Sequence, residues 1–535
     1  MTTLFLILVG VVVLLCIGLN SISSRIGVPA LLAFILLGIL FGNSGLIPLQ
    51  FDDHEAAKEI CSIALIFIMF YGGFGTRWKS ARPIVAEASL LASLGVVFTA
   101  AFTGLFCHYV LKWDWIESFL LGAVVSSTDA ASVFSILRSK KLGLKNNTAP
   151  ILEMESGSND PMSHMLTLLM LSIMKGTATG GSIAWMLFAQ IAFGLGCGFF
   201  IATLAATFLE RVHIKDNGYD SLFFVATALL AYAIPEIIGG NGYLSVYIVG
   251  VYLGNREFPG RKALVNFFDG ITGFAQVIIF FLLGLLARPA EFHKVILPAL
   301  AIFAFMLLVA RPLSVMSILT PFRKYPFRQQ ALVSFVGLRG AASIVFAIVA
   351  TSDTVSPTHD IFNVVFCLVL ISISLQGSLI PFVSKKLKMV DAKVDVMKTF
   401  NDYSEQKELQ AGSIDIVPGG SWDGKRVMDL DLPKNMMLAL VLRGEERIIA
   451  KGDTVLQAGD KVVVVTKTFD EKEIFLIEKR VKKNGRRAGH AIKDVSGEGL
   501  VLLVRRDDED FIPDGDTVLL EGDILVLLRH EKTTA

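Results

Sequence analysis

Long apolar stretches, separated by short polar loops, fill the first 388 residues of the chain. A helix needs about 20 apolar residues to cross a membrane, and fewer where it is broken or buried in protein. On that measure the pattern predicts thirteen spans, or twelve if one of the short stretches does not cross. They lie near residues 4–20, 28–42, 60–74, 84–110, 117–137, 151–174, 182–208, 220–235, 242–254, 266–287, 295–319, 329–351 and 359–382.

The basic residues of the loops orient these spans. Alternate loops hold 19 Lys and Arg, whereas the loops between them hold 5. By the positive-inside rule, this predicts a multi-pass protein of the cell (inner) membrane with its N-terminus outside and its C-terminal tail in the cytoplasm. The first apolar run has no basic segment before it and no small-residue cleavage site after it, so we interpret it as a retained span.

Charge separates the chain into two parts. Residues 1–388 carry 26 basic and 20 acidic side chains, and the remaining 147 residues carry 23 and 28, so the net charge of +1 is an average. This pattern excludes a single soluble domain and a disordered chain. All five cysteines lie in apolar stretches without metal-ligand spacing, which excludes a disulfide scaffold. We expect no cofactor in the membrane part, lipids as its surroundings, and no nucleic acid as a partner.

A few ionisable residues lie within the apolar segments, where a charge is costly and marks a functional site by default. They fall in segments 122–134, 151–166 and 334–347, and are Asp129, Glu153, Glu155, Asp160, His164 and Arg339.

The first and third of these segments each hold a polar cluster between small residues, at 126–132 and 337–343. They are seven spans apart and would cross in opposite directions, so we expect interrupted helices in an inverted repeat, with a cation site at mid-membrane. The alternative is that the small residues only allow close helix packing, which would not explain Asp129 and Arg339.

The middle segment supplies oxygen ligands. Ser156 and Asp160 share a helical face, and Pro161 loosens the backbone beside them. A hydroxyl, a carboxylate and carbonyls suit a hard cation, and a carboxylate in low dielectric can also hold a proton. The alternative is that Asp160 only pairs with Arg339, a role for which Glu155 is better suited. His164, one turn further on, could sense pH or simply form a structural hydrogen bond.

Together these motifs resemble the cation:proton antiporter 1 family, in its NhaP-type and cell-volume-regulation group. The resemblance covers the membrane half and rests on Thr128-Asp129, on the run from Glu155 to Pro161, and on Gly337-Leu338-Arg339-Gly340. It implies an all-α polytopic membrane domain with the NhaA-like antiporter fold, an elevator motion and a homodimer.

The resemblance also implies roles for individual residues. Asp160 would be the exchanged carboxylate. Around it would lie Ser156 as a ligand, Thr128 offering its backbone carbonyl, Asp129 orienting the ion or binding it through water, Asn159 bracing the crossing, and Glu155–Arg339 as a structural ion pair.

One position departs from the family pattern. Many relatives have an acidic residue in the third span where this chain has Tyr71, and losing that charge would favour K⁺ over the more strongly hydrated Na⁺. With Asn at 159, Asp160 is the one titrating group of its pair, so we expect electroneutral one-for-one exchange.

The tail contains an internal repeat. Residues 449–465 and 512–528 share two Gly-Asp turns and an apolar strand at an offset of 63, which predicts a small α+β module used twice. The first copy resembles the RCK-type TrkA-C module of potassium channels and transporters. We expect a transmembrane domain at 1–384, a linker at 385–410, and modules at 411–470 and 471–535. Such modules can regulate through nucleotides such as cyclic di-AMP, or serve as inert dimerisation tails.

The sequence therefore predicts a K⁺/H⁺ antiporter in which cation and proton compete for Asp160. Na⁺/H⁺ exchange is the nearest alternative. A ligand-gated K⁺ channel is a more distant one, because no Thr-Val-Gly-Tyr-Gly filter is present. An enzyme is disfavoured, because the tail has no nucleophile elbow and no phosphate loop.

Overall fold

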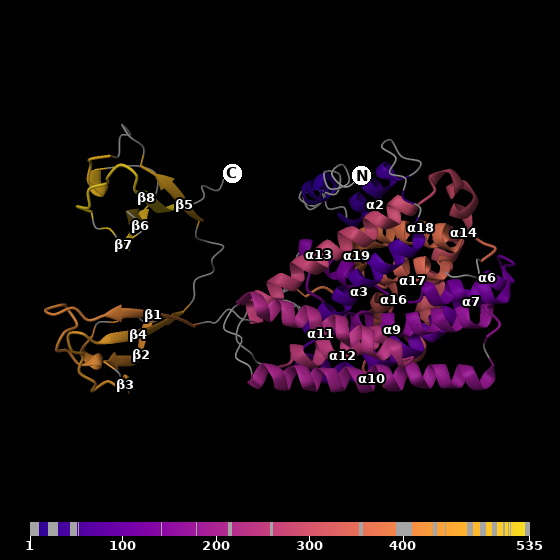
Figure 1. Cartoon of the computed structure of the whole chain (residues 1–535), viewed down its shortest axis with the longest axis horizontal. Coiled ribbons are helices and arrows are strands. Elements are labelled where there is room, and N and C mark those ends of the chain that lie inside the picture. Colours follow the sequence, from indigo (N-terminus) through magenta and orange to yellow (C-terminus); the bar gives the residue numbers. More distant parts are fainter. Residues whose placement is uncertain are drawn as a thin grey trace. The chain divides into compact units, whose positions relative to one another are not determined.

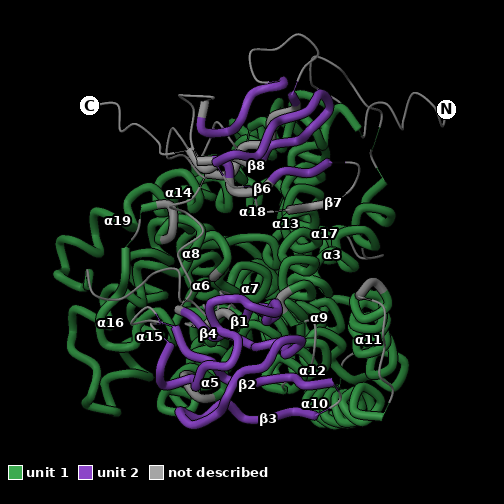
Figure 2. Tube along the Cα trace, turned by 90° about the vertical axis from the view of Figure 1, so that its left-hand side faces the viewer, with its two compact units in different colours: residues 1–403 green, residues 404–535 purple. Residues whose placement is uncertain are grey.

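The structure is a computed structural model of the whole chain. It describes residues 10–19, 30–42, 51, 53–140, 142–177, 179–211, 217–256, 261–352, 357–391, 409–430, 432, 436–444, 446–467, 475–481, 488–494, 500–506, 509–511, 513 and 515–529. The chain forms two compact units, residues 1–403 and 404–535 (Figure 2).

The first unit is built of helices (Figure 1). They are Gly10–Leu19, α2 (Ala30–Phe41), α3 (His54–Gly75), α4 (Trp78–Ala81), α5 (Val85–Leu90), α6 (Val96–Tyr109), α7 (Trp115–Val124), α8 (Ala130–Ser139), α9 (Thr148–Met174), α10 (Gly180–Arg211), α11 (Asn217–Ile237), α12 (Gly242–Gly254), α13 (Arg261–Leu286), α14 (Phe292–Phe305), α15 (Arg311–Leu319), α16 (Phe327–Phe335), α17 (Ala341–Thr351), α18 (Ile361–Ile371) and α19 (Gly377–Lys386). One-turn π-helical segments join α5 to α6, α14 to α15 and α18 to α19.

Among the described residues, seven helical runs are long and apolar enough to cross a membrane, and five shorter apolar helices accompany them. The expected polytopic helical domain is therefore confirmed, whereas the count of thirteen spans stays a prediction. The shorter helices include α7, α12 and α17, which lie beside the polar residues picked out from the sequence.

Two of the spans expected from the sequence, 117–137 and 329–351, are interrupted where the sequence indicated. Residues 125–129 separate α7 from α8, and residues 336–340 separate α16 from α17. The two non-helical stretches touch, because the backbone N–H of Asp129 donates to the carbonyl of Leu338 at 2.9 Å. Non-helical backbone is tolerated at membrane depth only where it is buried in protein or lines a cavity, and the side chains of Ser127, Thr128 and Leu338 are buried.

Close helix packing surrounds this crossing. On α12, a Cβ at Gly250 would collide with the carbonyl of Phe70 on α3, so only glycine allows that approach. On α13, Gly284 meets the backbone of Ile35 on α2 in the same way. These contacts pack α12 closely against α3, and α13 closely against α2.

The second unit contains two four-stranded antiparallel sheets with the same strand order. The strands are β1 (Leu409–Asp415), β2 (Met436–Arg443), β3 (Glu446–Ile449), β4 (Lys461–Lys467), β5 (Phe475–Arg480), β6 (Leu500–Arg506), β7 (Glu509–Phe511) and β8 (Ile524–Arg529). Their orders are β1-β4-β2-β3 and β5-β8-β6-β7. The repeat in the sequence thus forms the same sheet twice.

Each sheet is fastened by the same ion pair, between a partly exposed arginine and a buried aspartate. Arg443 donates to both carboxylate oxygens of Asp460 at 2.8 and 2.7 Å, and Arg506 does so to Asp523 at 2.9 and 2.7 Å. These hydrogen bonds lower the pKa values of Asp460 and Asp523. The aspartates were visible as Gly-Asp turns in the sequence, whereas their arginine partners were not singled out.

The start of the expected linker belongs to the membrane unit. The N–H of Lys145 donates to the carbonyl of Met389, and the N–H of Asp391 donates to that of Gly143, both at 2.9 Å. The side chain of Met389 is buried beside Leu144. Residues 387–391 are therefore fixed to the loop between α8 and α9, and 392–408, which we expected to continue the linker, lie outside the described residues.

Candidate cation site at the crossing of two interrupted helices

Arg339 closes the end of the first interrupted helix. Its Nη1 donates to the carbonyl of Ser126 at 2.8 Å and also to that of Ser127. These carbonyls lie in the non-helical stretch, two and three residues beyond the last residue of α7, near the negative end of the helix dipole. A guanidinium at this point satisfies both carbonyls and offsets the dipole.

Asp129 starts the second half of the same helix. Its carboxylate accepts from the N–H of Ser132 at 3.3 Å and from the hydroxyl at 2.6 Å, which is the geometry of a helix N-cap. Gly340 lies directly against this carboxylate, so a Cβ there would collide with it. Asp129 is therefore held by α8 and by the start of α17 at once.

The second interruption is closed from the π-helical turn between α18 and α19. The side-chain amide of Gln376 donates to the carbonyl of Phe335, the last residue of α16. Ser372 donates to Gln376 at 2.9 Å and accepts from the backbone N–H of Arg339 at 3.1 Å. Both broken helices thus have their free ends bound by side chains.

The polar face of α9 reaches the crossing. The hydroxyl groups of Thr128 and Ser156 lie 2.8 Å apart, and the amide of Asn159 donates to the Thr128 hydroxyl at 2.7 Å. All three side chains are buried. Asn159 therefore contacts the crossing as we expected of a bracing residue.

A cavity of about 470 Å³ opens beside these residues. Four carboxylates line it, and the described lining residues include no lysine or arginine. The four are Asp129, Glu153, Asp160 and Asp269. Asp160 is 8% exposed, and its Oδ1 is the one buried side-chain atom among the described lining residues without a hydrogen-bond partner. Such a cavity attracts cations, and Asp160 has an oxygen available at its wall.

A family model described as the transmembrane part of the sodium/hydrogen exchangers matches residues 10–386. The chain belongs to this family. A second model, the TrkA-C domain, matches residues 413–475 and again 476–531. The family of the membrane half and the TrkA-C modules of the tail are thus confirmed.

Named relatives are transporters rather than enzymes. A K⁺/H⁺ antiporter NhaP from Alkalimonas amylolytica is 35% identical over 88% of this chain and 82% of its own. A K⁺/H⁺ antiporter NhaP2 from Shewanella sp. ANA-3 is 33% identical over 84% and 78%. The structure of the sodium proton antiporter MjNhaP1 from Methanocaldococcus jannaschii matches with a TM-score of 0.62 at 22% identity, covering 71% of this chain and 97% of that one. The chain is a cation/proton antiporter of the NhaP type.

One expected contact of the antiporter is replaced by another. We expected Glu155 to pair with Arg339, but its ion pair is with Arg311 on α15. Arg339 instead binds the carbonyls of Ser126 and Ser127, beyond the end of α7, and α15 supplies the cation that pairs with Glu155. Arg311 also lies in an apolar stretch of the sequence, but sequence reasoning assigned it no partner.

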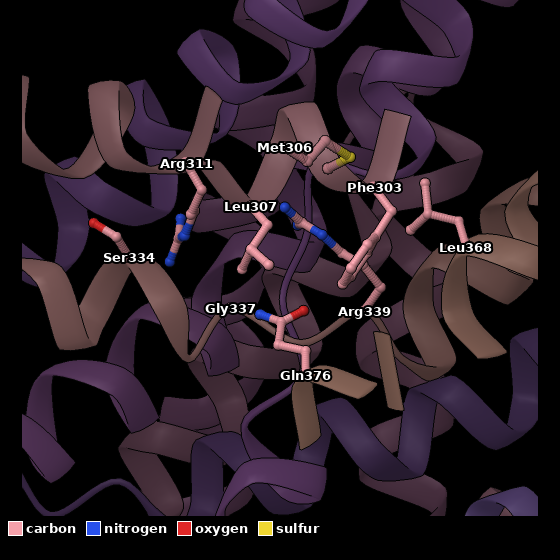
Figure 3. A pocket seen from close by; sticks show the side chains of 9 residues that line it. All are labelled: Phe303, Met306, Leu307, Arg311, Ser334, Gly337, Arg339, Leu368 and Gln376. Carbon is pink, nitrogen blue, oxygen red and sulfur yellow. The ribbon is translucent and has the colours of Figure 1, made fainter. Parts of the chain in front are cut away.

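Figure 3 shows both guanidinium groups at one small pocket of about 10 Å³, with Leu307 and Gln376 beside them. The side chains of Arg311 and Arg339 are 2% and 3% exposed. Two buried arginine side chains and one buried glutamate therefore lie beside the crossing, and none of the three lines the cavity.

The two suggested modulators lie in different surroundings. The ring of His164 packs edge-on against Tyr243 and close to Phe346, outside the cavity lining. Tyr71 lines the cavity, and its hydroxyl donates to Asp269 on α13 at 3.3 Å. Sequence reasoning missed Asp269, although an acidic residue eight positions into a long apolar helix was a signal that could have found it.

Proposed function

We propose that this antiporter exchanges K⁺ for H⁺ at Asp160, with the two ions competing for one carboxylate. The observation that carries the proposal is the buried, unpartnered Oδ1 of Asp160 at the wall of an acidic cavity. Ser156 and Thr128 line the same cavity and would supply further oxygen ligands, as would backbone carbonyls of the unwound stretch. Asp129 would orient the ion.

Charge balance around the crossing supports one-for-one exchange. Glu155 and Arg311 cancel as an ion pair, and the formal charges of Asp129 and Arg339 cancel each other. Among the charged groups at the crossing itself, Asp160 then remains, and either a proton or one monovalent cation would neutralise it; Glu153 and Asp269, which also line the cavity, lie outside this balance. A buried uncompensated charge is costly, so the empty, ionised state would be avoided between the two loaded ones.

K⁺ is the proposed cation, with Na⁺ as the alternative. Two relatives more than 30% identical are named as K⁺/H⁺ antiporters, whereas the structural relative is named as a sodium proton antiporter. The neutral Tyr71 supports K⁺, because a site with one fixed negative charge fewer favours the less strongly hydrated cation.

The wider mechanism is proposed along the family pattern. The protein would be a homodimer in the inner membrane, with its N-terminus outside, and the membrane domain would alternate by an elevator motion. The TrkA-C modules in the cytoplasm would regulate exchange, with a nucleotide such as cyclic di-AMP as one candidate ligand. The backbone pairing of Met389 and Asp391 with the loop before α9 would carry their influence toward Asp160.

The test is Asp160→Asn in proteoliposomes, with proton release measured after addition of K⁺, Na⁺, Rb⁺ or Li⁺. We expect no exchange from this variant, and normal exchange from the matched control Asp220→Asn on α11, which does not line the cavity. Cation-driven proton release retained by Asp160→Asn would overturn the proposal. A cation-dependent net current across the bilayer would refute electroneutral exchange.

A further inference from the structure

We propose that Asn241, the N-cap residue of α12, is a positioning residue for Asp160, and that it holds the cation-binding form of α9 in place. The inference rests on the proposed exchange at Asp160. The observation behind it is one buried contact. The side-chain amide of Asn241 donates to the carbonyl of Pro161 at 2.9 Å, and Pro161 directly follows Asp160.

The backbone of α9 is weak at this point. A proline has no N–H, so the carbonyl four residues earlier, on Gly157, loses its helical hydrogen bond. The weakened turn from Gly157 to Pro161 contains Asn159 and Asp160. An external donor on the carbonyl of Pro161 therefore holds a turn that the helix does not fully hold by itself.

Asn241 is itself held by two hydrogen bonds, which makes it a fixed donor. Its Oδ1 accepts from the N–H of Leu244 at 3.0 Å as the N-cap of α12. This bond fixes the orientation of the amide, so that the NH₂ group faces Pro161. Its backbone N–H donates to the carbonyl of Gln190 on α10 at 3.1 Å, and the residue is 3% exposed.

The neighbouring backbone leaves little freedom for this segment. A Cβ at Gly242 would come within 2.6 Å of the carbonyl of Tyr232, and a Cβ at Gly240 within 2.8 Å of Phe193. One turn and a half further along α12, the ring of Tyr247 packs over Gly157, at the start of the weakened turn. The helix α12 thus supports α9 at both ends of the turn that carries Asp160.

The opposite side of α9 has its own anchor. The hydroxyl of Ser163 donates to the carbonyl of Ala123 on α7 at 2.6 Å. Asn241 therefore holds the turn against α12, while Ser163 fixes the helix to the interrupted α7. Without Asn241, the turn would lose one of the contacts that, together with the bond from Asn159 to Thr128, set the distance of Asp160 from Thr128.

The loss of this contact should affect cation binding and proton binding at Asp160 differently. A cation needs several oxygen atoms at fixed distances, whereas a proton needs one oxygen of Asp160 alone. Removing the Asn241 donor should weaken cation binding and leave proton binding nearly unchanged. Protons would then displace the cation at a higher pH, so the acid side of the activity profile would move toward alkaline pH at a fixed K⁺ concentration.

Asn241→Ser separates positioning from capping, because serine is also a good N-cap but cannot reach Pro161. In proteoliposomes we expect its KM for K⁺ to rise about 3- to 10-fold, the range of a lost hydrogen bond of about 1 kcal/mol. The maximal rate at saturating K⁺ should stay near that of the unchanged protein, and the acid side of the profile should shift as described. Asn241→Ala should show the same changes and a lower melting temperature.

The matched control is Asn363→Ser. Like Asn241, Asn363 is a buried asparagine at the start of a membrane helix, but its side-chain amide donates to Asp360 within its own segment instead of to α9. We expect KM and the pH profile of this control to stay unchanged.

A purely structural role for Asn241 would lower the maximal rate with KM and the pH profile intact, and that result would overturn the inference. Failure of the proposed function looks different, because Asp160→Asn would then retain exchange. If Asp160→Asn is inactive and Asn241→Ser behaves as the unchanged protein, only the positioning role is wrong.

Discussion

Replacing Arg311 by methionine tests the buried ion pair behind the crossing. Arg311 is 2% exposed and Glu155 is 0% exposed, so neither charge is relieved by water. The Nε and Nη1 atoms of Arg311 have no hydrogen-bond partner among the described residues, so methionine removes little beyond the ion pair. The cost comes from Glu155, whose carboxylate would be left buried beside a neutral side chain.

Breaking a buried ion pair from one side costs about 3–5 kcal/mol, whereas replacing both partners by neutral groups is often close to neutral. We therefore expect Arg311→Met and Glu155→Gln each to lower the free energy of unfolding by about 3–5 kcal/mol. The double variant should lose less than either single variant. The coupling energy in the cycle should then be several kcal/mol.

The assay is unfolding of the purified protein in mixed micelles, followed by tryptophan fluorescence. A second cycle with Arg339→Met and Glu155→Gln serves as the comparison. Arg339 donates to the carbonyls of Ser126 and Ser127, so Glu155→Gln should not rescue its loss. Rescue of Arg339→Met and not of Arg311→Met would refute the assignment of the pair.

Three further predictions concern other parts of the molecule. Gly340→Ala would drive a methyl group into the carboxylate of Asp129, so it should abolish exchange in proteoliposomes even where purification yields folded protein. In the tail, the pKa of Asp460 is lowered in the folded sheet, so its carboxylate stabilises the first sheet at pH values above its usual pKa of about 3.9. This stabilisation is lost as the pH falls through the lowered pKa. Hydrogen exchange in β4 should therefore show that Asp460→Asn destabilises the sheet at pH 7 and that this effect shrinks below about pH 4. A chain ending after Asp391 should stay folded, and regulation by the tail would appear as a changed pH profile of exchange. A chain ending after Leu387 lacks the buried Met389 and should have a lower melting temperature.

The fold was largely predictable because membrane burial leaves a strong pattern. Apolar runs, basic loops and two clusters of small and polar residues were enough to predict the helical domain and the interruptions at 125–129 and 336–340. The repeat of 63 residues predicted two like modules in the tail. The boundary between the membrane domain and the linker was harder to predict, since Met389 pairs with the membrane unit although its polar neighbours indicated a linker.

Contacts between distant segments were harder to predict. Arg311 and Arg339 are both single charges in apolar surroundings, and nothing in their spacing shows which one faces Glu155. Which arginine pairs with Glu155 depends on the backbone carbonyls just beyond α7, which can bind Arg339 because the helix is interrupted there. Asn241 was missed for a similar reason, because an asparagine before a short apolar helix has the ordinary pattern of an N-cap, and its contact with Pro161 lies 80 residues away.

The hydrogen bonds around the crossing give a physical reason why one carboxylate among several is free to exchange ions. Asp129 caps α8, Asp269 accepts from Tyr71, and Glu155 is bound to Arg311. Each of these groups already has a hydrogen-bond or ion-pair partner that offsets part of the cost of its charge. Asp160 has a buried oxygen without such a partner, so binding an ion there lowers the cost of burial. The same reasoning predicts that a hydrogen-bond donor introduced next to Asp160 would slow exchange, because it would give this oxygen the partner that its neighbours already have.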